Sequence, residues 1–355
     1  MGFQPTQQTI IIKYQNPITT SKKISHNQNT MDQPIYTNRI PLEDLQQAVA
    51  NVRAEIGKII VGQERTIDLL IAALLSDGHV LIEGVPGVAK TLTAKLLART
   101  LSVKFSRIQF TPDLMPSDVV GTSVFSLKSN EFEFRAGPIF SNIVLIDEIN
   151  RAPAKTQSAL FESMEERQVT VDGKTYSLDV PFMIVATQNP VEQEGTYRLP
   201  EAQLDRFLFK IDVDYPTLQH ETKILSDFHA RKNSLDIPSV KPVISAEQLK
   251  GFRDKVYSLH VEPNLLSYIA QIVGQTRNNS ALYLGASPRA SLAILTSAKA
   301  IAAMRGRDFV MPDDIREVAP AVLQHRVMLT PEKEMEGQSA KDVVSQIIQQ
   351  VEIPR

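Results

Sequence analysis

Residues 84–91 read GVPGVAKT and directly follow the largely apolar run 79–83, HVLIE. A strand that runs into a glycine-containing loop, which ends in Lys-Thr and opens a helix, is typical of nucleoside triphosphate sites. Backbone N–H groups of such a loop point at the phosphates, and the positive end of the helix dipole lies behind them. The stretch therefore predicts a phosphate-binding loop. Lys90 would reach the β- and γ-phosphates, and the Thr91 hydroxyl would bind Mg²⁺.

One position of this loop departs from the pattern GxxxxGK[ST], because Ala89 stands where the second glycine is expected. Alanine has the smallest side chain after glycine, so we expect the loop to close, with less freedom to adopt a positive φ. The residues predicted to contact the nucleotide are those of the loop and the helix start: Gly84, Val85, Pro86, Gly87, Val88, Ala89, Lys90, Thr91 and Leu92.

The composition excludes several classes of protein. Of the 355 residues 43% are hydrophobic and 22% charged, and the net charge of −2 gives no global basic field for nucleic acid or an anionic membrane. The absence of cysteine excludes disulfides, thiolate metal sites and a cysteine nucleophile. The longest apolar stretch, 67–75, is broken by Asp68 and is too short to span a bilayer. No signal peptide is visible, so we expect a cytoplasmic protein.

The order of predicted elements divides the chain into four parts. Residues 1–40 are polar without a sustained period, so we expect a flexible tail in which Met31 is an alternative start. Residues 41–213 alternate strands and helices, which predicts an α/β domain with a doubly wound parallel sheet. Residues 214–330 read as a smaller all-α lid domain, and residues 331–355 as a tail with one amphipathic helix that could dock or float.

A second motif, a strand that ends in two acidic residues, supports the prediction of a nucleotide site. The apolar run 143–146 predicts a central strand that carries Asp147 and Glu148 at its carboxyl end, where parallel sheets bind ligands. We expect Asp147 to hold Mg²⁺, directly or through water, and Glu148 to polarise the water that attacks the γ-phosphate. The alternative is a pair of acids that cap a helix. An intact Glu148 favours hydrolysis over binding alone.

Two further candidates follow a predicted strand. Asn189 lies just past the buried run 182–187, where its amide could orient the attacking water, although an Asn-Pro turn would look the same. Arg206 is a candidate arginine finger that one subunit offers to its neighbour's phosphates. Arg198 is a competing candidate nearby, and an ordinary salt-bridged surface arginine is the alternative.

The last candidate opens a helix. Ser287 is a good N-cap and Pro288 suits the first helical position, which leaves Arg289 at a helix start. A fixed cation and free N–H groups would meet an anion there. A capped helix whose arginine is solvated is the alternative.

The order of these elements resembles that of an AAA+ ATPase, and the sequences of the motifs resemble those of the MoxR family in particular. The segments that carry the resemblance are GVPGVAKT, LIDEINRAPAKTQSALFESMEERQVTVDG, ATQNPVEQEGTYRLPEAQLDRF and GASPRA. It covers about residues 41–330, and Ala89 matches MoxR usage.

The resemblance implies a role for each polar candidate: catalytic base for Glu148, first sensor for Asn189, finger for Arg206 and second sensor for Arg289. It also implies that Val61 and Gly62 lie near the adenine. The inserts at 122–140 and 168–180 resemble the two hairpins that this clade places around a ring pore.

Together these features predict an ATPase that uses ATP and Mg²⁺ and assembles into a ring, expected to be a hexamer. By resemblance it would be a chaperone-like factor in the maturation, or metal-cofactor insertion, of a client protein, alongside a von Willebrand A-type partner. A nucleic-acid motor of the AAA+ class is one alternative, but the hairpin near residues 167–176 carries only Arg167 and Lys174 as cations. A magnesium-chelatase-like subunit and a nucleotide-binding scaffold without turnover are the others.

Overall fold

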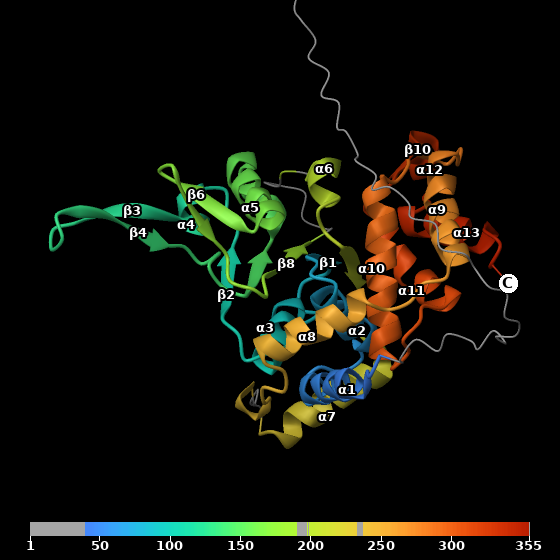
Figure 1. Cartoon of the computed structure of the whole chain (residues 1–355), viewed down its shortest axis with the longest axis horizontal. Helices are drawn as coiled ribbons and strands as arrows, with labels where there is room; N and C mark the ends of the chain where they lie inside the picture. The colour runs from blue at the N-terminus through green and yellow to red at the C-terminus, as the bar shows by residue number, and fades with distance from the viewer. Residues whose placement is uncertain (1–39, 190–196, 198, 233–236, 355) are drawn as a thin grey trace, which may run out of the picture. The chain divides into compact units, whose positions relative to one another are not determined.

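The computed structural model describes residues 40–189, 197, 199–232 and 237–354. Its centre is a five-stranded sheet in the order β2-β5-β8-β1-β9, with every neighbouring pair parallel (Figure 1). The strands are β1 (Val80–Gly84), β2 (Phe105–Gln109), β5 (Ile143–Asp147), β8 (Met183–Gln188) and β9 (Phe209–Val213). The predicted doubly wound α/β domain is confirmed. The tail predicted for residues 1–40 lies, except for its last residue, outside the described part of the chain.

Alternate residues of the three central strands, β5, β8 and β1, enter two different hydrophobic clusters, because successive side chains of a strand point to opposite faces. On β5, Ile143 and Leu145 join one cluster, and Val144 and Ile146 join the other. All four are fully buried, which explains why the strand reads as a continuous apolar run. The sheet is therefore covered on both faces.

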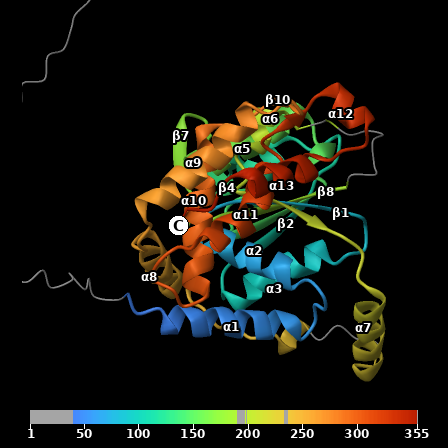
Figure 2. The same ribbon diagram turned by 90° about the vertical axis from the view of Figure 1, so that its right-hand side faces the viewer.

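Helices cover these two faces. On one side lie α1 (Glu43–Gly57), α2 (Glu64–Leu75) and α3 (Lys90–Thr100), which pack on one another (Figure 2). On the other side lie α4 (Pro116–Val120) and α5 (Ala154–Glu166). Short 3-10 turns occupy Ile149–Arg151 and Ile237–Ser239.

Two hairpins occupy the places of the predicted inserts. The first is β3 (Gly121–Ser126) with β4 (Glu131–Ala136), and the second is β6 (Gln168–Val171) with β7 (Lys174–Ser177). Asp172 and Gly173 turn the second hairpin with φ of 50° and 75°, as a two-residue Asp-Gly turn requires. Phe134 stacks on Tyr176 with ring centroids 4.1 Å apart, so the two hairpins are in contact.

The C-terminal third is helical, as predicted. After the short α6 (Glu201–Leu204), its helices are α7 (Leu218–Ala230), α8 (Ala246–Tyr257), α9 (Pro263–Arg277), α10 (Pro288–Met304), α11 (Pro312–Leu323), α12 (Pro331–Met335) and α13 (Ala340–Gln350). One addition to the all-α prediction is a two-stranded antiparallel sheet of β10 (Leu282–Leu284) and β11 (Met328–Leu329). The amphipathic helix α13 docks on α9 and α11 through buried apolar side chains.

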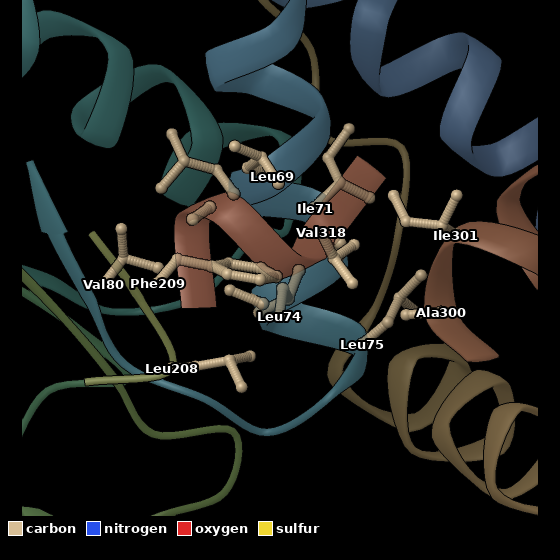
Figure 3. Close-up of a cluster of buried hydrophobic side chains, with 14 of the residues drawn as sticks. Leu69, Ile71, Leu74, Leu75, Val80, Leu208, Phe209, Ala300, Ile301 and Val318 are labelled. Carbon is tan, nitrogen blue, oxygen red and sulfur yellow. The ribbon is translucent and has the colours of Figure 1, made fainter. Parts of the chain in front are cut away.

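The helical region shares one buried core with the sheet. Leu74 of α2, Phe209 of β9, Ile301 of α10 and Val318 of α11 meet in a single cluster (Figure 3). Each is at most 3% exposed. Helix α11 contacts β9, and its Pro320 and Ala321 line the same cavity as Val88 and Ala89 of the predicted phosphate loop.

Candidate active site

The predicted phosphate loop joins β1 to α3. Ala89, the residue before α3, has φ 60° and ψ 22°, so the position expected to hold glycine does require a left-handed backbone, and alanine adopts it. Such a conformation costs a non-glycine residue about 1 kcal/mol or more. The Lys90 ammonium donates to the backbone carbonyl of Gly84 and lies 3.5 Å from that of Gln188. The loop is thus folded around its lysine.

Asp147 lies directly beside the loop. Its carboxylate is 3.3 Å from the Thr91 hydroxyl, accepts from the Thr187 hydroxyl at 3.1 Å and pairs with Arg107 Nε at 2.6 Å. Hydroxyl and carboxylate oxygens are the donors that Mg²⁺ prefers, and Mg²⁺ usually takes only one or two protein carboxylates beside water and phosphate oxygens. The donor pair fits that ion. Within the described residues no group of three His, Cys, Asp or Glu side chains could form an all-protein metal site.

Glu148 leaves the strand with a left-handed backbone, φ 58° and ψ 52°. Its N–H donates to the Thr187 hydroxyl at 3.1 Å. Its carboxylate accepts from the Gln109 amide at 2.8 Å and lies 3.3 Å from Arg151. The two acids therefore face different partners, and the side chain of Glu148 remains 31% exposed, within reach of water.

Asn189 directly follows β8 and is buried, 7% exposed. Because β8 lies between β1 and β5 in the sheet, its carboxyl end is next to both the loop and the acids. The structure thus brings together the loop, Asp147, Glu148 and Asn189.

A cavity of about 620 Å³ opens beside the loop. Its walls come from residues 59–66, from the loop and α3, from residues 210–217 and α7, and from α11 and α13. Val61 and Gly62, predicted to lie near the adenine, are among them. Helix α7 has no buried residue, and its His220, Ile224, Leu225 and Phe228 form one wall.

Gly62 has a packing reason to be glycine. Its φ is +75°, and a Cβ there would lie 2.3 Å from Nδ1 of His220. The next residue, Gln63, donates to the Val88 carbonyl at 2.7 Å and accepts from the Thr93 hydroxyl at 3.3 Å. Residues 61–63 are thereby fixed to the phosphate loop.

The two predicted functional arginines lie together, and neither lines the cavity. Arg206 donates to the Phe161 carbonyl at 2.8 Å and lies 3.5 Å from Glu165 of α5. Arg289 donates to the same Glu165 at 2.8 Å and lies 3.9 Å from Asp205. Their side chains are 32% and 47% exposed, so both groups are open to solvent. Arg198, the competing finger candidate, lies outside the described residues.

Comparisons with known proteins agree with this geometry. Residues 79–209 match the family model "ATPase family associated with various cellular activities (AAA)", and residues 274–347 match the AAA lid domain. Chaperone MoxR1 of Mycobacterium tuberculosis is 44% identical over 310 residues, which cover 85% of this chain and 81% of that protein. This chain belongs to the MoxR family of AAA+ ATPases.

Two further proteins are similar over comparable lengths. The uncharacterized YeaC of Bacillus subtilis is 48% identical, covering 88% of this chain and 97% of YeaC. A solved structure of a proposed ATPase from Cytophaga hutchinsonii is 42% identical with a TM-score of 0.81, covering 88% of this chain and 97% of that one. The MoxR chain described here accordingly binds nucleotide and hydrolyses ATP. None of its described helices combines the length and apolar character that crossing a bilayer requires.

Several contacts of this MoxR site have no signal in the sequence. Arg107 and Gln109 reach the acids because β2 pairs with β5 in register, Gln109 beside Asp147. No pattern within residues 105–109 indicates which strand lies beside them. The contact of Glu165 with both arginines likewise joins segments that no local pattern connects.

Proposed function

We propose that this MoxR ATPase works as a ring, a hexamer, in which each reaction centre is built by two subunits. One subunit supplies the loop, Asp147 and Glu148, and its neighbour supplies Arg206 and Arg289. The observation that supports this is the pairing of both arginines on Glu165, outside the cavity of their own chain. Because both side chains are partly exposed, an approaching triphosphate could replace the carboxylate as their partner.

The chain's own residues would act as follows. Lys90 and the loop N–H groups bind the phosphates. Glu148 takes a proton from the attacking water, and the Asn189 amide orients that water. Mg²⁺, held by Thr91 and Asp147, would neutralise charge on the β- and γ-phosphates. The neighbour's arginines would stabilise the charge that develops as ADP leaves.

We further propose that residues 41–213 act as the ATPase core and residues 214–330 as the lid, in a cytoplasmic chaperone-like factor. The name Chaperone MoxR1 of a relative supports a client protein as partner. Maturation of that client, or insertion of its metal cofactor, together with a von Willebrand A-type partner, is the role we propose.

Complementation between two inactive variants tests the shared centre. Glu148→Gln should keep ATP bound but stop turnover, and Arg206→Ala should bind ATP normally while its assembled rate falls by about 10³-fold or more. In a mixture, the arginine of the Glu148→Gln chain should serve the intact pocket of the Arg206→Ala chain and restore hydrolysis.

Arg53→Ala is the matched control, since Arg53 is an exposed arginine of α1 that pairs with Asp68. It should leave the rate unchanged. Mixed rings that assemble but stay inactive would exclude Arg206 as a group that acts between subunits.

A further inference from the structure

The segment that carries Arg206 is held by a residue just past the end of α11. Arg326 is buried, with 3% of its side chain exposed, and its Nε lies 2.6 Å from the carboxylate of Asp205. Asp205 immediately precedes Arg206. The two residues of the ion pair are 121 positions apart, so the contact joins the lid helices to the end of α6.

A guanidinium has five N–H donors, and every one of those of Arg326 has a partner. Nε binds the carboxylate of Asp205; one terminal nitrogen binds the carbonyls of Asp205 and Phe207, at 3.0 and 2.7 Å; the other binds those of Leu208, at 3.1 Å, and Val322. Four of the five bonds thus end on residues 205–208. A buried guanidinium with all donors satisfied fixes a backbone more firmly than any single contact.

The neighbouring His325 adds a fifth bond to the same segment. Its Nε2 donates to the Phe207 carbonyl at 2.9 Å. Burial holds the pKa of His325 well below its ordinary value, so the ring stays neutral. His325 and Arg326 therefore bind the chain on both sides of Arg206, at Asp205 and at residues 207–208.

Asp205 connects Arg326 to the second arginine, Arg289. Its carboxylate accepts from the Ser287 hydroxyl at 3.2 Å and lies 3.9 Å from Arg289, while Arg326 holds its other oxygen. The Asp205 side chain thereby links the segment that carries Arg206 to the start of α10.

We propose that Arg326 is a positioning residue for Arg206 and Arg289, acting through Asp205. This rests on the proposed sharing of the reaction centre between subunits. Misplacing a catalytic group by about 1 Å can cost about 100-fold in rate. Weakening the hydrogen bonds of Arg326 should therefore slow ATP hydrolysis in the neighbouring subunit's pocket. Lysine keeps the charge but has three donors on a flexible stem, and it cannot reproduce the fork.

The experiment puts Arg326→Lys on either chain of the mixed ring. In the Glu148→Gln chain, which supplies the arginine, the substitution lies beside the working Arg206. There it should lower the restored rate by at least about tenfold. In the Arg206→Ala chain, which provides the intact pocket, the arginine that Arg326 would position is already absent. There Arg326→Lys should change the restored rate less than twofold, and the KM for ATP of that chain should not move.

An equal loss on both chains, or no loss on the supplier, would overturn the proposal, because a residue that only stabilises the fold acts wherever it is placed. If the parent mixture without Arg326→Lys fails to recover activity, the shared centre itself is wrong, which is a separate result. Where Arg326→Lys does not fold, Asp205→Asn in the same two chains gives the answer, since it keeps the side-chain volume and weakens the ion pair.

Arg253→Lys is the matched control. Arg253 is also a buried arginine, but its partners are the Leu74 carbonyl, at 2.9 Å, and Asp77, at 2.9 Å, and not residues 205–208. It should lower the melting temperature about as much as Arg326→Lys and leave complementation intact on either chain.

Discussion

The two sides of the proposed reaction centre are built in opposite ways. The cavity side consists of one continuous loop and the ends of adjacent strands, and its groups already contact one another, as Thr91 and Asp147 do at 3.3 Å. The arginine side is assembled from α5, the end of α6, the start of α10 and the residues after α11. Its cations are paired with carboxylates of their own chain, Glu165 and Asp205.

In the shared centre that we propose, this difference leaves one side complete in an isolated chain and the other dependent on a neighbour. Partly exposed ion pairs contribute about 0–1 kcal/mol, so Glu165 can release its arginines at little cost. A triphosphate brings more negative charge than one carboxylate. The arginines are thus held by weak pairs, whereas the backbone beside Arg206 is bound by the buried guanidinium of Arg326.

The largest effect should come from the cavity side. Lys90→Ala removes a cation that the loop encloses, so ATP affinity should fall by about 100-fold or more, measured by titration calorimetry. Lys95→Ala, an exposed lysine of the same helix, is the control and should bind normally. Retained affinity in the Lys90 variant would mean that the cavity is not a triphosphate site.

Arg289→Ala should have an intermediate effect. Removing one charge-stabilising donor should lower the assembled rate by about 100-fold while the variant's own ATP affinity stays the same. Mixing with Glu148→Gln should restore activity, as for Arg206→Ala. A loss of the variant's own affinity, without recovery in the mixture, would place Arg289 in the pocket of its own chain and break the comparison.

The smallest effect should come from Glu165→Gln. Neutralising the carboxylate that holds both arginines makes them available, so the assembled rate should rise by up to about fivefold, with thermal stability changed by less than about 1 kcal/mol. Glu162→Gln, on the solvent side of the same helix, should change neither quantity. A slower enzyme would mean that Glu165 helps to present the arginines.

The sequence predicts the elements whose signals are local. The apolar run 143–146 predicts β5, and Ser287 with Pro288 predicts the start of α10, both close to the observed bounds. Strand β9 is not predicted, although its Phe209, Ile211 and Val213 alternate with the charged Lys210 and Asp212, as expected of a strand at the sheet edge. The small sheet of β10 and β11 is missed because its strands have three and two residues.

The candidate site follows the same rule. The loop, Asp147 and Glu148 are each read from a few consecutive residues, and the fold needs only to bring strand ends together. The roles predicted for Glu148, Asn189, Arg206 and Arg289 stay predictions. The contacts of Arg326 with Asp205, and of Arg289 with Glu165, join residues more than 120 positions apart, which no periodicity or spacing could connect.

Helix α7 makes the cavity open to redesign. Since none of its residues is buried, Leu225 and Phe228 can be exchanged for smaller side chains without leaving a hole in the interior. If the base lies against this wall, a trimmed α7 would admit an ATP analogue enlarged on its purine ring that unmodified ATPases reject. Such a pair would allow this one enzyme to be driven or blocked by a synthetic nucleotide inside a living cell.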